Sequence, residues 1–395
     1  MNKNQSTGRY ETRRWTSRID DRLSGDIQVF IPDAPLAFHH DADPAALADA
    51  EHMLHAVNTS PQVARVGNLL GKVEAIASSR FEGLGRPTAH ILDAAGMPGA
   101  TQDLATARIL GNLTVMEEAM QPEVEIAAHE VLHRWHLAVM APRSDEGTPM
   151  GAYRVTQNWI GLPGSTPITA TFVPAPADLI EPLMGDLLSF VNERTLSPII
   201  QAAVAHAHFE AIHPFGDGNG RIGRALIYRM LASRGAIWTA PPPISPFILQ
   251  DPHTYIAGLT AYRSGQTSVW VDTFVRLLDD ACVHSLLLAS AVANLTETWT
   301  ERVSDVRRDS MDHSIVSELI ENPILDAQAV AARFGKSTVA ARDALERLEK
   351  RGILVERPLR RGLRGRPARV FEASGLLDLL DERPQSLAAR PQTKR

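Results

Sequence analysis

The chain has 395 residues, 44% of them hydrophobic and 22% charged, with a formal net charge of −6, and this length predicts two or three domains. The single cysteine, Cys282, excludes an intrachain disulfide and agrees with a reducing compartment. The sequence begins without the apolar segment of a signal peptide, and no apolar run reaches the ~18 residues of a membrane span, so we expect a cytoplasmic protein with no membrane partner.

The N-terminal third is predicted to be helical after a polar start. Residues 1–30 are expected to form an extended N-terminal arm, and residues 31–115 an N-terminal helical region. The strongest helix is expected where apolar residues recur at helical spacing, with Gly83 supplying its stop. The helices expected in this region cover residues 44–60, 63–85 and 101–120.

The middle of the chain also follows a helical pattern. A helix is expected over 122–141, followed by a segment rich in Gly, Pro and Thr at 141–176 that is predicted to be a loop or short β-hairpin. Because strands do not alternate with helices, the predicted fold class is all-α: a helical bundle whose core spans 116–308, with a short β-hairpin. The later helices are expected over 178–193, 198–212 and 220–234, and then across about 252–308.

A glycine-rich segment between two of these helices, "HPFGDGNGRIGR" at 213–224, carries side chains suited to chemistry. Pro214 disfavours helix at His213, which therefore lies at the helix end or in the loop. A second helix begins near Gly220, and the free N–H groups at its start attract anions. The histidine can be neutral near pH 7 and could accept a proton from a hydroxyl.

The charged residues of the segment suggest what it could bind. Arg221 and Arg224 are three residues apart on the second helix and could lie over one anion. Asp217 offers an oxygen ligand of the kind Mg²⁺ prefers beside phosphates. From the chemistry alone, the segment is either a polyphosphate–Mg²⁺ cradle with a base beside it or a glycine-rich turn with solvated charges.

The same twelve residues resemble the signature of the Fic family: His-Pro-Phe, any residue, Asp or Glu, Gly-Asn-Gly-Arg, two variable residues and Arg. The resemblance, which covers roughly residues 30–290, implies a Fic-type helical bundle that transfers AMP from ATP to a Ser, Thr or Tyr hydroxyl of a target protein. It also implies auto-AMPylation, Mg²⁺ as cofactor and a homodimer. By position, His213 is the base, Phe215 anchors the loop and Asp217 holds Mg²⁺.

The anion-binding residues also follow from the resemblance. Gly218, Asn219 and Gly220 form the hole for the α- and β-phosphates. Arg221 contacts the phosphates, and Arg224 reaches the γ-phosphate. Related Doc-type proteins phosphorylate their targets, but they depart from the pattern in this loop, so the sequence favours nucleotide transfer. A nucleotide-sensing transcription regulator and an enzyme that removes AMP stay open as alternatives.

Two further segments resemble Fic features. Residues 151–161 and 172–192 are similar to the family's flap and following helix, and the flap is expected to align an extended target segment by strand addition. An ordinary surface loop is the alternative. The flap residues expected to face the target are Asn158, Trp159, Ile160 and Gly161.

"SSRFEG" at 78–83 resembles the family's inhibitory pattern of Ser or Thr, three residues, Glu, then Gly or Asn. Ser78 and Glu82 share a helix face, and the resemblance predicts that Glu82 pairs with Arg224 and blocks the γ-phosphate position, with Gly83 completing the motif. A solvent-facing glutamate near a helix end is the alternative. The expected class is the one whose inhibitory helix precedes the Fic core.

Two other motifs are weighed and set aside. "HEVLH" at 129–133 matches the helical zinc-protease pattern, but it has no third ligand at a recognisable spacing and His136 stands where an extended motif needs glycine. "FGKST" at 334–338 resembles the end of a phosphate-binding loop, but Val330 occupies the position of its first glycine.

A basic module is predicted over 311–374. Between Arg333 and Arg369 there are twelve Lys or Arg and four Asp or Glu. The element order resembles a winged helix-turn-helix, often fused to Fic cores, which implies double-stranded DNA as partner. In the third helix Val339, Ala340, Leu345 and Leu348 are expected to face inward. A protein-interaction module is the alternative, and residues 384–395 are expected to be a disordered tail.

The DNA contacts implied by that resemblance begin the third helix and continue on a basic wing. They are Ser337, Thr338 and Arg342 on the helix, and Arg360, Arg361, Arg364 and Arg366 on the wing.

Overall fold

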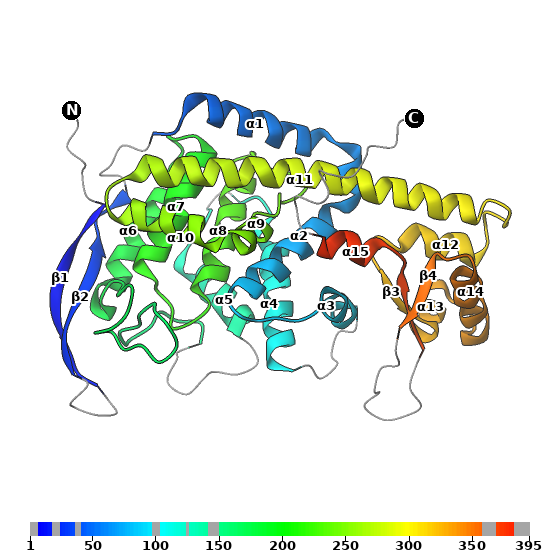
Figure 1. Ribbon diagram of the computed structural model, residues 1–395, viewed down its shortest axis with the longest axis horizontal. Helices are drawn as coiled ribbons and strands as arrows, with labels where there is room; N and C mark the ends of the chain where they lie inside the picture. The colour runs from blue at the N-terminus through cyan, green and yellow to red at the C-terminus, as the bar shows by residue number, and fades with distance from the viewer. Residues whose placement is uncertain are drawn as a thin grey trace.

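A computed structural model shows a mainly helical body joined to a smaller C-terminal module through one long helix, α11 (Thr267–Arg302) (Figure 1). Helix α1 (Pro44–Thr59) lies along the outer face of α11. None of the described helices is long and apolar enough to cross a membrane. The structure describes residues 7–17, 24–35, 41–96, 103–123, 126–140, 150–357 and 369–382.

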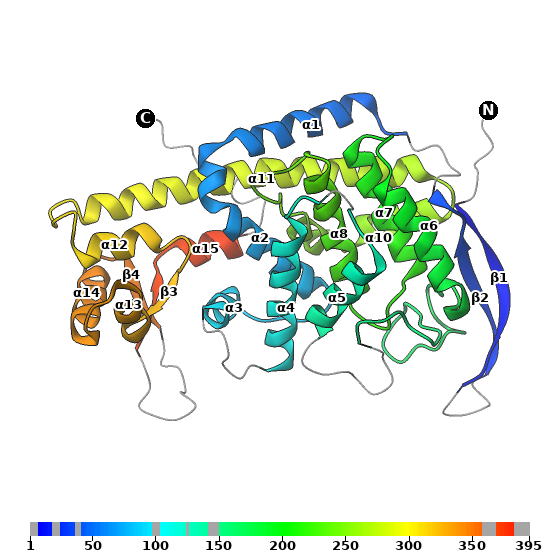
Figure 2. The same cartoon turned by 180° about the vertical axis from the view of Figure 1, so that it is seen from behind.

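The helical body is built around two adjacent helices that are buried on all sides. Every residue from Ile199 to Ile212 in α7 (Pro198–Ile212) is buried, and so is every residue from Asn219 to Ala232 in α8 (Asn219–Ser233). The body also contains α3 (Thr88–Ala95), the short 3₁₀ helix η3 (Ala177–Leu179) and α9 (Ser245–Gln250). Helix α7 packs against α6 (Ile180–Asn192), α10 (Pro252–Arg263) and α11, and α8 packs against α2 (Pro61–Phe81), α4 (Leu104–Ala119) and α5 (His129–Met140), all seen from behind in Figure 2. This packing holds the α7–α8 loop at the surface on a rigid base.

The histidines of α7 lie inside this core. His206 Nε2 is 2.7 Å from the Tyr255 hydroxyl, and His208 Nδ1 is 3.2 Å from the Tyr262 hydroxyl, both on α10. Burial lowers the pKa of His206. These histidines therefore pair with a neighbouring helix.

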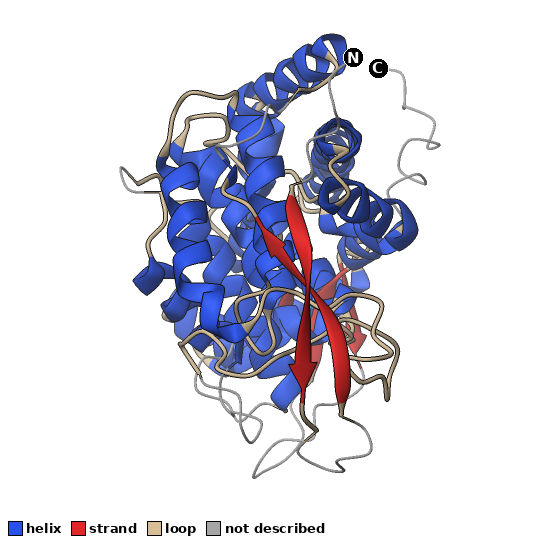
Figure 3. Cartoon of the chain, turned by 90° about the vertical axis from the view of Figure 1, so that its left-hand side faces the viewer, coloured by secondary structure: helices blue, strands red, loops and turns tan. Residues whose placement is uncertain are grey.

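The prediction of an extended arm over 1–30 is wrong for its described part. Strands β1 (Gly8–Trp15) and β2 (Gly25–Pro32) pair antiparallel from Gly8 with Pro32 to Trp15 with Gly25, and Figure 3 shows this hairpin crossing one end of the bundle. Val29 and Ile31 of β2 are buried in the core. The hairpin forms because β2 presents an apolar face to the helices, while the charged β1 covers its open edge.

The prediction of a helix over 122–141 is wrong in its first part, since α5 begins only at His129. Pro122 has no N–H to donate to a helix. The carbonyls of Gln121 and Ile126 instead accept hydrogen bonds from buried Arg229 of α8, at 2.8 and 2.9 Å. The helices expected across about 252–308 are α10 and α11, which a turn at Gly265, with φ +83°, separates.

The predicted flap hairpin is reduced to one bridging pair. Ile160 N donates to Phe172 O at 2.8 Å, and Phe172 N donates to Ile160 O at 3.0 Å. The residues between them form turns. Phe30 N of β2 donates to Val173 O at 3.0 Å, so the N-terminal hairpin supports the flap from outside.

The C-terminal module combines helices with a small sheet. Its three strands pair antiparallel in the order β3-β5-β4. Its elements are α12 (Met311–Glu318), β3 (Ile324–Asp326), α13 (Ala327–Phe334), α14 (Thr338–Lys350), β4 (Leu354–Arg357), β5 (Val370–Ala373) and α15 (Leu376–Asp381).

The buried face of helix α14 is only partly the predicted one. Leu345 and Leu348 are buried as expected, but Val339 is 62% exposed and Ala340 is exposed too. Ala341 and Ala344 take their places in the core. The correction leaves the start of α14 open to solvent.

Candidate active site

The loop between α7 and α8 begins with an unusual backbone conformation at His213. His213 has φ 53° and ψ 61° and is the one non-glycine residue with positive φ in the described part of the chain. A bulky residue adopts the left-handed region only when its surroundings enforce it. The side chain is 18% exposed, so the imidazole is reachable from solvent at the rim of the core.

A buried carboxylate lies behind the imidazole. His213 Nδ1 is 3.5 Å from Glu210 Oε2, one turn earlier on α7. Burial raises the pKa of Glu210, while the nearby His213 and His206 lower it more, so the net change is downward. An anionic Glu210 favours a proton on Nδ1, which leaves Nε2 free to accept one.

The rest of the loop is braced from within. Asn219 Oδ1 accepts from Phe215 N, and Asn219 Nδ2 donates to Phe215 O, both at 2.8 Å. Phe215 is fully buried and stacks on His136 with 4.3 Å between ring centroids. The Asn219 side chain thus holds the loop closed. Gly218, with φ +81°, turns the backbone so that α8 begins directly after it.

Asp217 is the exposed carboxylate of the loop, with 47% of its side chain accessible. Its Oδ1 accepts from Gly218 N at 2.6 Å, and its Oδ2 lies 3.4 Å from Arg108 Nη1. In the described residues, no group of three or more His, Cys, Asp or Glu could hold a metal. A single exposed carboxylate fits an ion that is shared with bound phosphates better than one held by the protein alone.

Arg221 lies beneath the loop and is 1% exposed. Its Nη1 donates to Val139 O at 2.8 Å, and its Nη2 lies 3.8 Å from Asp217 Oδ1. Burial lowers the pKa of Arg221, and Asp217 partly offsets this. Arg221 therefore places a fixed positive charge under the anion-binding end of α8.

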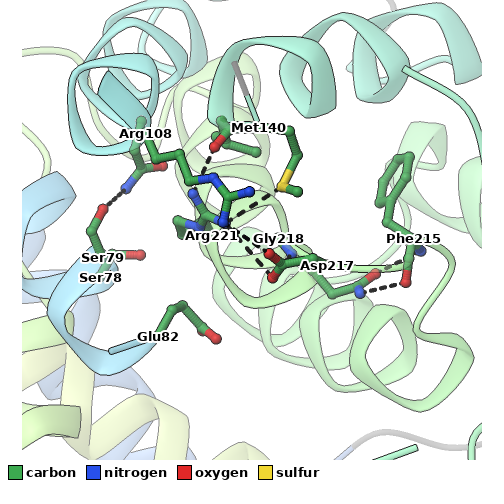
Figure 4. Close-up of polar contacts among 12 residues, drawn as sticks. Ser78, Ser79, Glu82, Arg108, Met140, Phe215, Asp217, Gly218 and Arg221 are labelled. Carbon is green, nitrogen blue, oxygen red and sulfur yellow. Dashed lines mark hydrogen bonds and ion pairs between the residues drawn. The ribbon is translucent and has the colours of Figure 1, made fainter. Parts of the chain in front are cut away.

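Arg224 is paired with the end of helix α2, as the inhibitory pattern predicted. Its Nη2 lies 2.7 Å from Glu82 Oε1, its Nε donates to Ser78 Oγ at 2.8 Å, and the same Nη2 donates to Ser78 O at 3.0 Å. Burial lowers the pKa of Arg224 but the Glu82 carboxylate raises it more, so the net change is upward. Figure 4 shows Ser78 and Glu82 facing the loop.

The carboxylate of Glu82 also covers the start of α8. A Cβ built on Gly220 would collide with Glu82 Oε1. The helix that carries Glu82 ends there, because Glu82 is the C-cap of α2 and the following Gly83 has φ +80°. The Glu82 carboxylate thus lies against Gly220 and Arg224, two residues for which the resemblance implies phosphate contacts.

The flap residues divide between the loop and the solvent. Asn158 Nδ2 donates to Phe215 O at 3.0 Å, so it supports the α7–α8 loop. Trp159 and Ile160 are 38% and 40% exposed, and the Trp159 ring meets Trp15 edge-on with 6.1 Å between centroids. Gly161 packs against Ser165. Of the four predicted target contacts, Trp159 and Ile160 present apolar surface to solvent.

One segment of the chain matches a known protein family. Residues 126–231, which include the loop and the flap, match the Fic/DOC family. This chain contains a Fic domain. A Fic family protein from Desulfovibrio desulfuricans has a similar fold in its crystal structure, with a TM-score of 0.53 and 18% sequence identity over 85% of this chain and 98% of that one.

Relatives of the Fic domain carry a named activity. The chain is 31% identical over 157 residues to protein adenylyltransferase Fic of Nematostella vectensis, covering 39% of this chain and 33% of that protein. It is also 31% identical over 224 residues to protein adenylyltransferase Fic of Drosophila grimshawi, covering 50% of this chain and 41% of that protein. The aligned regions thus span less than half of these relatives' length.

The structure places the other predicted residues in different surroundings. His129 Nδ1 lies 2.8 Å from the Tyr153 hydroxyl, and His133 packs edge-on against the same ring at 4.5 Å, so both histidines of the Fic domain's "HEVLH" face one tyrosine. Ser337 caps α14, and Thr338 and Arg342 are exposed beside it. The wing residues Arg360, Arg361, Arg364 and Arg366, and the expected tail at 384–395, lie outside the described residues.

Three side chains that contact the loop were not predicted from the sequence. Arg108 approaches Asp217, Glu210 lies behind His213, and Arg154 is buried against the loop backbone. Of these, only Glu210 carried a signal in the sequence, because i,i+3 spacing from His213 places both on neighbouring turns. The other two reach the loop through tertiary contacts.

Proposed function

We propose that this protein transfers AMP from ATP to a hydroxyl side chain of a target protein and that Glu82 restrains this activity. The observation that carries the proposal is the juxtaposition of solvent-reachable His213 with an anion-binding helix start flanked by Arg221, Arg224 and Asp217. The activity named for the similar Nematostella and Drosophila proteins supports the same reaction.

In the proposed reaction, the target hydroxyl is deprotonated by His213 as its oxygen attacks the α-phosphorus of ATP. The new oxygen–phosphorus bond joins AMP to the target. The bond between the α-phosphorus and the oxygen leading to the β-phosphate breaks, and pyrophosphate leaves. The N–H groups at the start of α8, together with Arg221, stabilise the negative charge that develops on the phosphates.

A magnesium ion fits the loop at Asp217, whose carboxylate is half exposed on the anion-binding side. When bound, Mg²⁺ would neutralise phosphate charge and so favour attack on the α-phosphorus. The role of this chain is to hold Asp217 in place. The hydrogen bond from Gly218 N and the nearby guanidinium of Arg108 orient the carboxylate.

The brake follows from the contacts of Glu82. A carboxylate paired with buried Arg224 and resting on Gly220 competes with the γ-phosphate for the same guanidinium and the same helix start. ATP is then expected to bind in a pose that does not align the α-phosphorus with the target hydroxyl. Removing the carboxylate frees both groups.

The test is transfer of label from ATP in the presence of Mg²⁺. Glu82→Gly is expected to raise auto-AMPylation at least tenfold over the parent chain, equivalent to about 1.4 kcal/mol. His213→Ala in the Glu82→Gly background is expected to abolish incorporation while ATP still binds. An equal rate in the parent and Glu82→Gly chains would contradict the brake, and undiminished labelling without His213 would contradict the base.

A second candidate function is binding of double-stranded DNA by the C-terminal module, which we propose to be a winged helix. The exposed start of α14, with Ser337, Thr338 and Arg342 together, favours it. The basic excess is smaller than the sequence suggests, because several arginines form ion pairs within the chain. These pairs are Arg333–Glu318, Arg347–Asp312, Arg351–Asp305, Arg357–Glu372 and Arg369–Glu356.

Fluorescence anisotropy with a labelled duplex tests this second function. Binding is expected to weaken steeply as salt rises, because phosphate contacts release counterions. Arg342→Glu is expected to weaken it, whereas Arg307→Glu, at an 87% exposed side chain in the connection before the module, is the matched control. Absence of binding at low salt, or equal loss with both variants, would contradict this function.

A further inference from the structure

Arg154, at the start of the flap, is 2% exposed and grips backbone carbonyls of two separate segments. Its Nε donates to His213 O at 2.9 Å, and its Nη2 reaches Ile212 O at 3.4 Å. Its Nη1 donates to Thr156 O at 2.9 Å, and its Nη2 also donates to Ala175 O. One guanidinium thus joins the catalytic histidine to both limbs of the flap.

The contacts on the histidine side explain how its backbone is held. The last carbonyls of α7 have no helical partner, and a cation near a helix C-terminus satisfies them. Arg154 N also donates to Pro214 O at 2.9 Å. The carbonyls of His213 and Pro214 are therefore both held by one residue, which supports the left-handed φ of 53° at His213.

The contacts on the flap side set where a target segment would lie. Thr156 and Ala175 stand on opposite limbs, before and after the Ile160–Phe172 bridge. A planar guanidinium directs its five N–H donors at fixed angles, so it defines the separation of the limbs as well as their distance from the loop. A lysine ammonium could not replace this geometry.

We propose that Arg154 is a positioning residue that locks the flap and the His213 backbone into one geometry, so that a hydroxyl presented on the flap meets the imidazole. The activity part of this inference rests on the proposed AMP transfer. The structural part does not rest on AMP transfer. It predicts that Arg154 orders the flap and the His213 backbone together, whether or not the protein transfers AMP.

The experiment compares Arg154→Met and Arg154→Lys with Arg229→Met, all in the Glu82→Gly background. Arg229 is the matched control because it is also buried, at 4% exposure, and also donates to backbone carbonyls, those of Glu118, Gln121 and Ile126. It lies away from the loop. Melting temperature, ATP affinity by calorimetry, single-turnover label transfer at saturating ATP and amide hydrogen exchange are measured for each.

Both Arg154 variants are expected to lower the transfer rate at least tenfold while the Kd for ATP stays within about twofold. Arg229→Met is expected to lower the melting temperature without a comparable loss of rate. Amide exchange is expected to rise together over 154–161 and 212–216 in the Arg154 variants alone. If the transfer rate of Arg154→Lys is as low as that of Arg154→Met, the shape of the guanidinium, and not its charge, is required.

A transfer rate in Arg154→Met equal to that of its parent would overturn the proposal, as would a loss no greater than in Arg229→Met at the same melting temperature. If the Glu82→Gly parent transfers no AMP, the proposed function fails. Amide hydrogen exchange then tests the role of Arg154 separately. Faster exchange in the flap with unchanged exchange over 212–216 would then refute the coupling.

Discussion

His136 supports the α7–α8 loop from below, and this support depends on pH. It is fully buried, stacks on Phe215 and accepts a hydrogen bond at Nδ1 from Gly151 N at 2.9 Å. Burial lowers its pKa from 6.5 to about 4. Only the neutral ring can accept that bond, so its protonation would disturb the anchor of the loop and the start of the flap together.

We therefore expect stability to fall as the pH drops from about 6.5 towards 4. Between those values the unfolded chain binds a proton at His136 that the folded chain excludes, so unfolding is favoured by about 2 kcal/mol at pH 5 relative to neutral pH. His136→Phe keeps the stacking and is expected to flatten this part of the melting-temperature profile. An identical slope for the parent and the variant between pH 5 and 7 would contradict the assignment.

The site residues could be predicted from sequence where they lie in one segment. Asp217, Arg221 and the surroundings of His213 follow from the segment 213–224, because spacing along a helix start fixes which groups can converge. Asn219 is predicted to help form the anion hole, and its side chain also braces Phe215, a role that the sequence did not indicate. Arg154 could not be found this way, since its partners are backbone carbonyls that carry no mark in the sequence.

At the scale of elements, the brake depends on how firmly α2 is seated. Glu74, two turns before Glu82, is fully buried, and its carboxylate accepts from Ser245 N at 2.8 Å and from Ser245 Oγ at 2.5 Å. Burial raises the pKa of Glu74, and the hydrogen bonds from Ser245 oppose that rise. The contact fastens α2 to the beginning of α9.

Glu74→Ala is expected to destabilise the protein by about 2–3 kcal/mol, because the buried N–H and hydroxyl of Ser245 lose their hydrogen-bond partner. With α2 loosened, Glu82 should release Arg224 more often and auto-AMPylation should rise, though less than in Glu82→Gly. Denaturant unfolding and label transfer measure the two effects. A loss of stability without any gain in transfer would show that the contact between Glu74 and Ser245 does not affect the brake.

Helices were easier to predict than strands for a physical reason. The apolar pattern of α7 sets its limits locally, and 198–212 matches the observed range. Strand β1 has a charged sequence, GRYETRRW, and becomes a strand only because β2 lies beside it. Likewise, the bridge between Ile160 and Phe172 depends on support from β2, which lies more than a hundred residues earlier.

At the scale of the whole molecule, the C-terminal module contacts α2, the helix of the proposed brake. Asp381 of α15 accepts a hydrogen bond from Thr88 at 2.5 Å and lies 3.4 Å from Arg80, two residues before Glu82. A cavity of about 350 Å³ separates α15 from α2, with Leu380 on one side and Ile76 on the other. The module therefore contacts the helix that carries Glu82, and we expect it to influence the proposed brake.

Asp381→Ala tests that route. Since Arg80 and Asp381 are about one third and one half exposed, their pairing contributes at most about 1 kcal/mol, and a rise in auto-AMPylation of about two- to fivefold is expected. Asp309→Ala removes a comparable but more exposed partner, that of Arg307, and serves as the control. Equal transfer rates for the parent and Asp381→Ala would show that the module does not influence the brake.

The central claim is that His213 directs AMP transfer from ATP held at the start of α8. The most direct measurement compares ATP labelled at the α-phosphate with ATP labelled at the γ-phosphate, using the Glu82→Gly chain and Mg²⁺. The account predicts protein labelling from the α-position alone, and none when His213→Ala is added. Labelling from the γ-position, or labelling that persists without the imidazole, would contradict it.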